Sequence, residues 1–196
     1  MTTLSRRRWL AVVGSAAFAG CSGRNEASQE PTETPSPTET PEPYTPTLHA
    51  GRPDGPDSDA AIGMTCDTGE NRYYFVPSLV WLAPSGSLTW SVQSRCRQWT
   101  VAYHPDNDRQ LRMPEGGRPW QSPVYQGSGT FTHRLDVPGV YDAVGLHEAA
   151  GQVATVLVGR PDLDDQPALN ADDGNLPPAA RKQLALHHEV VRELLA

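Results

Sequence analysis

The chain has 196 residues, and its 16 Lys and Arg against 23 Asp and Glu give a net charge of −7. Removing the first 20 residues would take three basic residues and no acid, which leaves 13 bases against 23 acids and a net charge of −10. Phosphate binding needs basic patches, so this composition argues against nucleic acid as a partner. One lysine, Lys182, accompanies fifteen arginines, and such an acidic, lysine-poor surface suits a high-salt environment.

The N-terminus has the pattern of an export signal, expected over residues 1–20. Three consecutive arginines, Arg6 to Arg8, form a twin-arginine pattern, and the apolar run 9–20 that follows is shorter than the roughly 20 residues a membrane-spanning helix needs. The run ends in small residues before Cys21, which resembles a lipobox. We therefore expect export by the twin-arginine route and anchoring to the outer face of the cell membrane, with lipidated Cys21 in the bilayer. Plain signal cleavage near Ala19 is the alternative.

Residues 21–60 lack any apolar periodicity. The central part, 31–43, is an imperfect Pro-Thr-Glu repeat that cannot bury apolar surface. We expect this whole region to be a disordered, extended tether between the lipid and a folded domain.

From residue 61 to 161 short runs rich in β-branched and aromatic residues alternate with turn signals such as Pro84-Ser85-Gly86 and Pro138-Gly139. About seven short strands at this spacing predict an all-β domain, a β-sandwich. The long stretch between residues 104 and 128 is expected to be one surface loop anchored by Trp120. The expected strands are Arg72–Val76, Leu79–Ala83, Ser87–Val92, Trp99–Tyr103, Thr130–Leu135, Val140–Val144 and Val153–Val158.

The C-terminal region 162–196 differs from the domain before it. An acidic linker, Asp162–Asp173, leads to a predicted helix over Ala179–Leu195, whose apolar stripe is expected to pack on the sandwich. His187 and His188 are neighbours on this helix, so their rings point about 100° apart and do not converge on one metal ion. We expect the pair at the edge of the packed helix face.

Two cysteines fall within the predicted domain. Disulfides persist in exported proteins, so Cys66 and Cys96 are expected to form one, which closes a loop of about 30 residues and contributes about 3 kcal/mol in the chain-entropy account. The alternative is that Cys96 is a metal thiolate, which would leave Cys66 as an odd thiol in an oxidising compartment.

The strand order, the export signal and several motifs together resemble halocyanin, the plastocyanin-like cupredoxin of halophilic archaea. The resemblance implies a cupredoxin-like Greek-key β-sandwich and, in the family, a blue type 1 copper ion. It covers roughly residues 70–161, and the tail at 176–181 is also similar. The segments that carry it are Tyr73–Pro77, Pro84–Trp90, Thr100–Pro105, Pro119–Ser122 and Val140–Gly159.

The resemblance also locates the positions of the copper ligands. In the family these are a His before the Thr-x-Ala-Tyr strand, then a Cys, a His and a weak axial Met. The matching positions here are Gln98, Gly145, His147 and Gln152, so three of the four ligands are replaced. We expect these to be vestigial copper-site positions that hold no metal.

The replaced ligands differ in how much copper binding depends on them. An axial Gln is acceptable in blue-copper sites, because the axial bond is long and weak, whereas soft thiolate sulfur is what holds Cu(I). His104 lies six residues along the expected strand from Gln98, about 20 Å away if the strand is straight, so it cannot replace the lost ligand.

Enzyme signatures such as a Gly-rich phosphate loop or a Gly-x-Ser-x-Gly elbow do not occur, so a non-catalytic role is expected. The sequence predicts an exported, lipid-anchored cupredoxin-like domain that has lost type 1 copper. Such a domain would act as a binding or accessory module for a redox or surface protein. The alternative is a halocyanin-like copper protein in membrane-associated electron transfer, with copper as its cofactor.

Overall fold

The computed structural model describes residues 44–196. The expected twin-arginine signal, the lipidation of Cys21 and the Pro-Thr-Glu repeat lie outside the described residues. Within residues 44–196, no helix is both long enough and apolar enough to cross a membrane.

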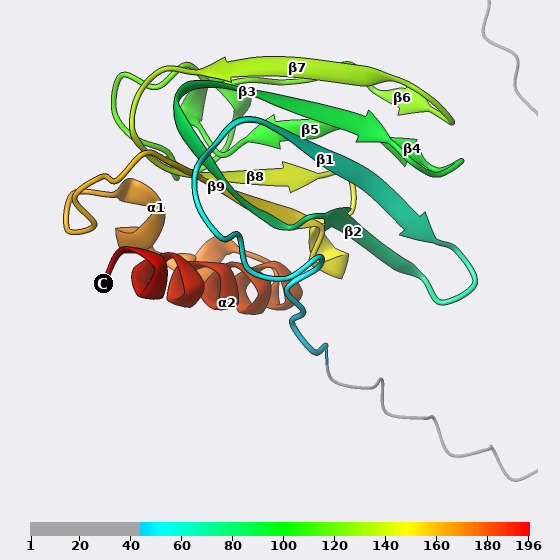
Figure 1. Cartoon of the computed structure of the whole chain (residues 1–196). Coiled ribbons are helices and arrows are strands. Elements are labelled where there is room, and N and C mark those ends of the chain that lie inside the picture. The colour runs from blue at the N-terminus through cyan, green and yellow to red at the C-terminus, as the bar shows by residue number, and fades with distance from the viewer. Residues whose placement is uncertain (1–43) are drawn as a thin grey trace, which may run out of the picture. The chain divides into compact units, whose positions relative to one another are not determined.

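The described residues form an all-β sandwich with a C-terminal helix, as the sequence predicted (Figure 1). One layer contains β2, β1, the second half of β3, and β7, and the other contains the first half of β3, then β9, β8 and β5. A separate two-stranded ladder joins β4 to β6. The strands are β1 Asp57–Asp67, β2 Arg72–Val76, β3 Leu79–Val92, β4 Arg97–Gln98, β5 Thr100–Ala102, β6 Tyr125–Gln126, β7 Thr130–Leu135, β8 Gly139–Gly145 and β9 Val153–Val158.

Strand β3 belongs to both layers. Its first residues pair in parallel with β9, and Gly86 to Ser91 pair antiparallel with β7. The expected turn at Pro84-Ser85-Gly86 is therefore a bend within one strand and not a break between two. Ser85 has a positive φ of 66°, and a Cβ at position 86 would overlap the carbonyl oxygens of Ser58 and Ala83, so this bend requires glycine.

Strand β1 was not predicted, and it begins inside the range expected for the tether. Its first residues, Asp57-Ser58-Asp59, have low strand propensity and are exposed. Pairing holds the strand in place instead, because Asp59 to Met64 run parallel to β3 and Gly63 to Asp67 pair with β2. The expected strand Trp99–Tyr103 is likewise replaced by β4 and β5, with Trp99 between them.

The predicted C-terminal helix is present as α2, Pro178–Leu195, and covers the layer that contains β8 and β9 (Figure 1). A central core lies between the two layers and includes Trp90, Trp120 and Tyr141, so Trp120 anchors its loop as expected. Two further apolar clusters lie between the sheet and α2.

The short helices are η1 Pro105–Asn107, η2 Glu148–Ala150, α1 Pro167–Asn170 and η3 Asp173–Asn175.

Candidate functional site

The four positions singled out by the resemblance lie together at one end of the sandwich. Gln98 ends β4, Gly145 ends β8, and Gln152 immediately precedes β9. The antiparallel pairings of β8 with β5 and with β9 bring these strand ends side by side, at Thr100 opposite Gly145 and Val144 opposite Val153.

A hydrogen-bonded amide pair fills the centre of this end. Nε2 of Gln152 donates to Oε1 of Gln98 at 2.7 Å, and both side chains are fully buried. Oε1 of Gln152 accepts from the backbone N–H of His147 at 3.1 Å. The backbone N–H of Gly145 donates to the carbonyl oxygen of Gln152 at 2.8 Å. The Gln152 amide therefore joins both sides of the loop to β4.

Glycine at position 145 is a steric requirement of this arrangement. Its φ is not in the left-handed region. A Cβ at this position, however, would lie far inside van der Waals contact with the Oε1 and Cδ atoms of Gln152. The Gln152 amide thus occupies the volume into which any side chain at position 145 would project.

His147 is half-buried in the turn after β8. Its ring stacks on Tyr73 with centroids 3.5 Å apart and an interplanar angle of 15°, and burial lowers its pKa. The neighbouring Glu148 accepts from the hydroxyl of Tyr103 at 2.7 Å and pairs with Arg109 at 2.5 Å. The turn is therefore held by contacts that involve no metal.

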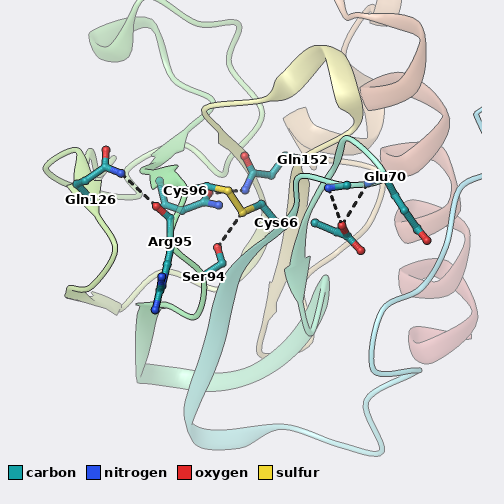
Figure 2. The surroundings of a disulfide bond; sticks show 10 residues. Cys66, Glu70, Ser94, Arg95, Cys96, Gln126 and Gln152 are labelled. Atoms are coloured by element: carbon teal, nitrogen blue, oxygen red, sulfur yellow. Dashed lines mark hydrogen bonds between the residues drawn. A yellow bond between two sulfur atoms is a disulfide. The ribbon is translucent and has the colours of Figure 1, made fainter.

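Cys66 and Cys96 form the predicted disulfide, with Cα atoms 6.4 Å apart. Figure 2 shows this bond with Ser94, whose hydroxyl lies 3.2 Å from Sγ of Cys66, and with Gln152 in its surroundings. The alternative of Cys96 as a metal thiolate is wrong, because both sulfurs are used in the bond. Cys21 lies outside the described residues.

The residues present do not fit a type 1 copper ion. Such a site needs two imidazoles and a thiolate around the metal. Here the two amides bind each other, Gly145 has no side chain, and His147 is the only imidazole of the four positions. The atom left without a partner is Nε2 of Gln98, an N–H donor that would not bind a cation. Among residues 44–196, no three His, Cys, Asp or Glu side chains gather as a metal site would require.

A second polar cluster, which the sequence analysis missed, surrounds Asp142 on β8. This fully buried carboxylate accepts from Arg112 at 3.2 Å and from the hydroxyl of Thr155 at 2.8 Å, and lies 3.0 Å from Nε2 of His188. Burial alone would raise the pKa of Asp142, but attraction to His188 and Arg112 and the hydrogen bonds of His188 and Thr155 together lower it. Asp142 is therefore ionised in the folded protein.

Hydrogen bonding fixes the tautomer of the neighbouring His187. The Thr155 hydroxyl donates to Asp142, so it must accept from Nδ1–H of His187, 3.3 Å away. Nε2 of His187 then accepts from the Gln183 amide at 2.8 Å and the Ser78 hydroxyl at 3.1 Å. A proton on Nε2 would face an N–H of the Gln183 amide. Burial accordingly lowers the pKa of His187 to about 3, and the ring is neutral.

The same cluster fastens the N-terminal segment. Oε1 of Gln183 accepts from the hydroxyl of Tyr44 at 2.7 Å and the N–H of Thr47 at 2.9 Å, and its Nε2 donates to the Thr47 carbonyl at 2.7 Å. The hydroxyl of Ser78 accepts from the N–H of His49 at 3.1 Å. Residues 44–49, expected in the solvated tether, therefore lie against α2.

His187 and His188 have separate partners, as their directions on the helix required. They are buried, however, with 0% and 6% exposure, and not at the edge of the packed face. The signal that could have found this cluster is Asp142 itself, a charged residue in the middle of the apolar run Val140–Val144.

Comparison with known proteins supports the fold. No protein-family model matches the chain, and no curated protein is significantly similar to it. Among solved structures, the pseudoazurin of Sinorhizobium meliloti has 20% identity and a TM-score of 0.51 over 69% of this chain and 95% of that protein. The pseudoazurin of Methylobacterium extorquens AM1 has 21% identity and a TM-score of 0.51 over 69% and 98%. At such identities the likeness shows the fold alone, and the domain has a cupredoxin-like fold.

The fit between Gly145 and Gln152 can be tested by a double-mutant cycle. We expect Gly145→Ala to lower the free energy of unfolding by about 1–3 kcal/mol, because the new methyl overpacks a filled volume. In a Gln152→Ala background the same change should cost at least about 1 kcal/mol less. Urea unfolding of the four proteins measures this coupling. Gly55→Ala, where a Cβ meets no atom, is the control. Equal costs in both backgrounds would contradict the proposed contact.

The neutral state of His187 predicts acid sensitivity. Its folded pKa is lowered to about 3, below the ordinary value of about 6.5. The stabilisation is therefore complete above pH 6.5 and is lost as the pH falls toward 3. The loss approaches about 1.4 kcal/mol per pH unit once the unfolded chain binds the proton. In His187→Gln the slope of unfolding free energy between pH 6 and 4 should shrink by nearly that amount. An unchanged slope in urea titrations would refute this assignment.

Proposed function

We propose that this protein is an exported, lipid-anchored cupredoxin-like domain that does not hold type 1 copper. It acts as a non-catalytic binding or accessory module for a redox or surface protein. The observation that carries the proposal is the buried pair of Gln98 and Gln152. This pair fills the centre of the copper end, by which we mean the end of the sandwich where the resemblance places the copper ligands, and it requires glycine at position 145.

The chemistry of the donor set supports loss of copper. Copper cycles between two oxidation states in an electron carrier, and thiolate sulfur holds the reduced ion. Both cysteines of the domain are joined to each other. The remaining groups are one imidazole and two amides, and the two amides already hydrogen-bond to each other. These groups would bind Cu(I) much less tightly than a thiolate does.

The export part of the proposal has separate support. The twin-arginine pattern and the small residues before Cys21 match a lipoprotein signal. A disulfide in the domain suits a compartment outside the reducing cytosol. An acidic chain with a single lysine suits high salt.

Copper loading tests the functional proposal. The full chain, with Cys21→Ser so that the expected lipid-anchor cysteine offers no free thiol, is equilibrated with equimolar Cu(II), passed through a desalting column, and measured for metal content and visible absorption. We expect no intense sulfur-to-copper charge-transfer band and less than one retained copper per chain, because no thiolate is available. One retained copper with an intense band would overturn the proposal in favour of an electron carrier.

Weak binding at surface histidines is separated from binding at the cupredoxin position by a variant. His147→Ala removes the one imidazole at that position and leaves the other histidines. Copper that this variant retains as well as the parent is bound elsewhere.

A further inference from the structure

A surface hollow of about 470 Å³ lies beside β7, at the open seam between the two layers. One wall is the segment 118–121, whose backbone is joined to β5 through the Trp120 carbonyl and the bridge between Val101 and Gln121. The other wall is β7 itself, from Phe131 to Arg134.

Strand β7 has a free edge along this hollow. Among the described strands it pairs only with β3, and of its backbone groups the Thr130 carbonyl already accepts from the Tyr125 hydroxyl at 2.7 Å. Thr130, Thr132 and Arg134 are exposed, while Phe131 and His133 are half-buried and turn toward the sandwich. An unpaired edge presents backbone N–H and C=O groups that can take up another strand.

The hollow is preformed by fixed aromatic side chains. Nε2 of His133 hydrogen-bonds to the carbonyl oxygen of Arg118 at 3.0 Å, which joins the two walls. The His133 ring lies 5.2 Å from that of Trp120 and 6.3 Å from that of Phe131. A ligand would therefore meet a surface that needs little reorganisation, which lowers the cost of binding.

The charge of the hollow is opposite to that of the chain. The whole protein has a net charge of −7, yet the hollow is lined by two arginines and one carboxylate, that of Asp136. Arg134 pairs with the exposed Asp136 at 2.8 Å, and Arg118 makes no ion pair with any residue of 44–196. Cations beside a free strand edge favour an acidic ligand and disfavour a basic one.

We propose that the free edge of β7 and this hollow bind an extended acidic segment of a partner protein. The segment adds to the sheet as a strand and directs alternate carboxylates toward Arg118 and Arg134. This deepens the proposed function, since it names the partner's chemistry, and it rests on the binding role alone. A copper-binding result would leave it standing, and its own failure would leave the copper conclusion unchanged.

Peptide binding to the full chain tests the proposal. The probe is an eight-residue peptide of alternating Thr and Glu, titrated calorimetrically at about 0.15 M salt, where surface charges are only partly screened. A Thr-Lys peptide reverses the charge, and a Thr-Glu peptide N-methylated at every residue keeps the charge but removes the backbone N–H donors on both edges. We expect the Thr-Glu peptide to bind at least about tenfold more tightly than either control.

Variants locate the binding surface. Arg118→Glu should weaken Thr-Glu binding about tenfold, because an attraction becomes a repulsion, and Arg118→Gln should weaken it less. Arg181→Glu, an exposed position on α2 at the opposite face of the sandwich, makes the same change in net charge and should have no effect. Far-UV circular dichroism confirms that each variant is folded.

Three outcomes would overturn the proposal. Equal affinity for the Thr-Lys peptide would exclude charge selection. Equal affinity for the N-methylated peptide would exclude strand addition. An equal loss in Arg118→Glu and Arg181→Glu would show a response to net charge and no docking at β7, and Arg134 would then act only as a charge that protects the edge from aggregation.

Discussion

The buried charge of Asp142 is the constraint around which the described structure is arranged. An ionised carboxylate inside a protein is costly unless other groups compensate it, and the effective penalty is several kcal/mol. The compensating groups come from three separate parts of the chain: Arg112 from the loop after β5, Thr155 from β9, and His188 from α2. Asp142 is therefore well compensated only when the loop and the helix have closed on the sheet.

The consequences extend outward from that carboxylate. Arg112 also donates to the carbonyl of Ala168 and pairs with Asp173, which fastens the acidic linker. The Thr155 hydroxyl also hydrogen-bonds to the ring of His187, which fixes the orientation of that ring. The other ring nitrogen of His187 hydrogen-bonds to Ser78 and Gln183. A polar network of this kind specifies one geometry, because each donor and acceptor restricts the next.

A different interaction holds the copper end together. It lies at Gly145, three residues after Asp142 on β8. Neutral amides form the cross-link there, and Gly145 provides the space for it. In a type 1 site a metal ion would join the same strand ends. We propose that the hydrogen-bonded amide pair does so in this domain, which would keep the cupredoxin-like scaffold complete without metal.

Several features could be predicted from sequence because their signals are local. Strands rich in β-branched residues and the helix α2 belong to this group. The disulfide spans 30 residues, but it could be predicted because Cys66 and Cys96 are the two cysteines of the domain. Strand β1 could not be predicted, because its Asp- and Gly-containing sequence depends on pairing with β3. Asp142 itself stands out as a charge in an apolar run, but no local signal links it to Arg112 and His188, which lie 30 and 46 residues away in the chain. Gln98 and Gln152 were identified through family resemblance, and their hydrogen bond became evident only in the structure.

The central claim is that the domain closes its copper end without metal. The effect of copper on the free energy of unfolding tests this claim most directly. Urea unfolding of the full chain is compared in EDTA and in tenfold excess Cu(II), with His147→Ala measured in parallel. The account predicts that copper changes the unfolding free energy of both proteins equally, by no more than about 0.5 kcal/mol. A ligand that binds the folded state at 100 times its Kd stabilises it by about 2.7 kcal/mol. A gain of that size in the parent, lost in His147→Ala, would contradict the account.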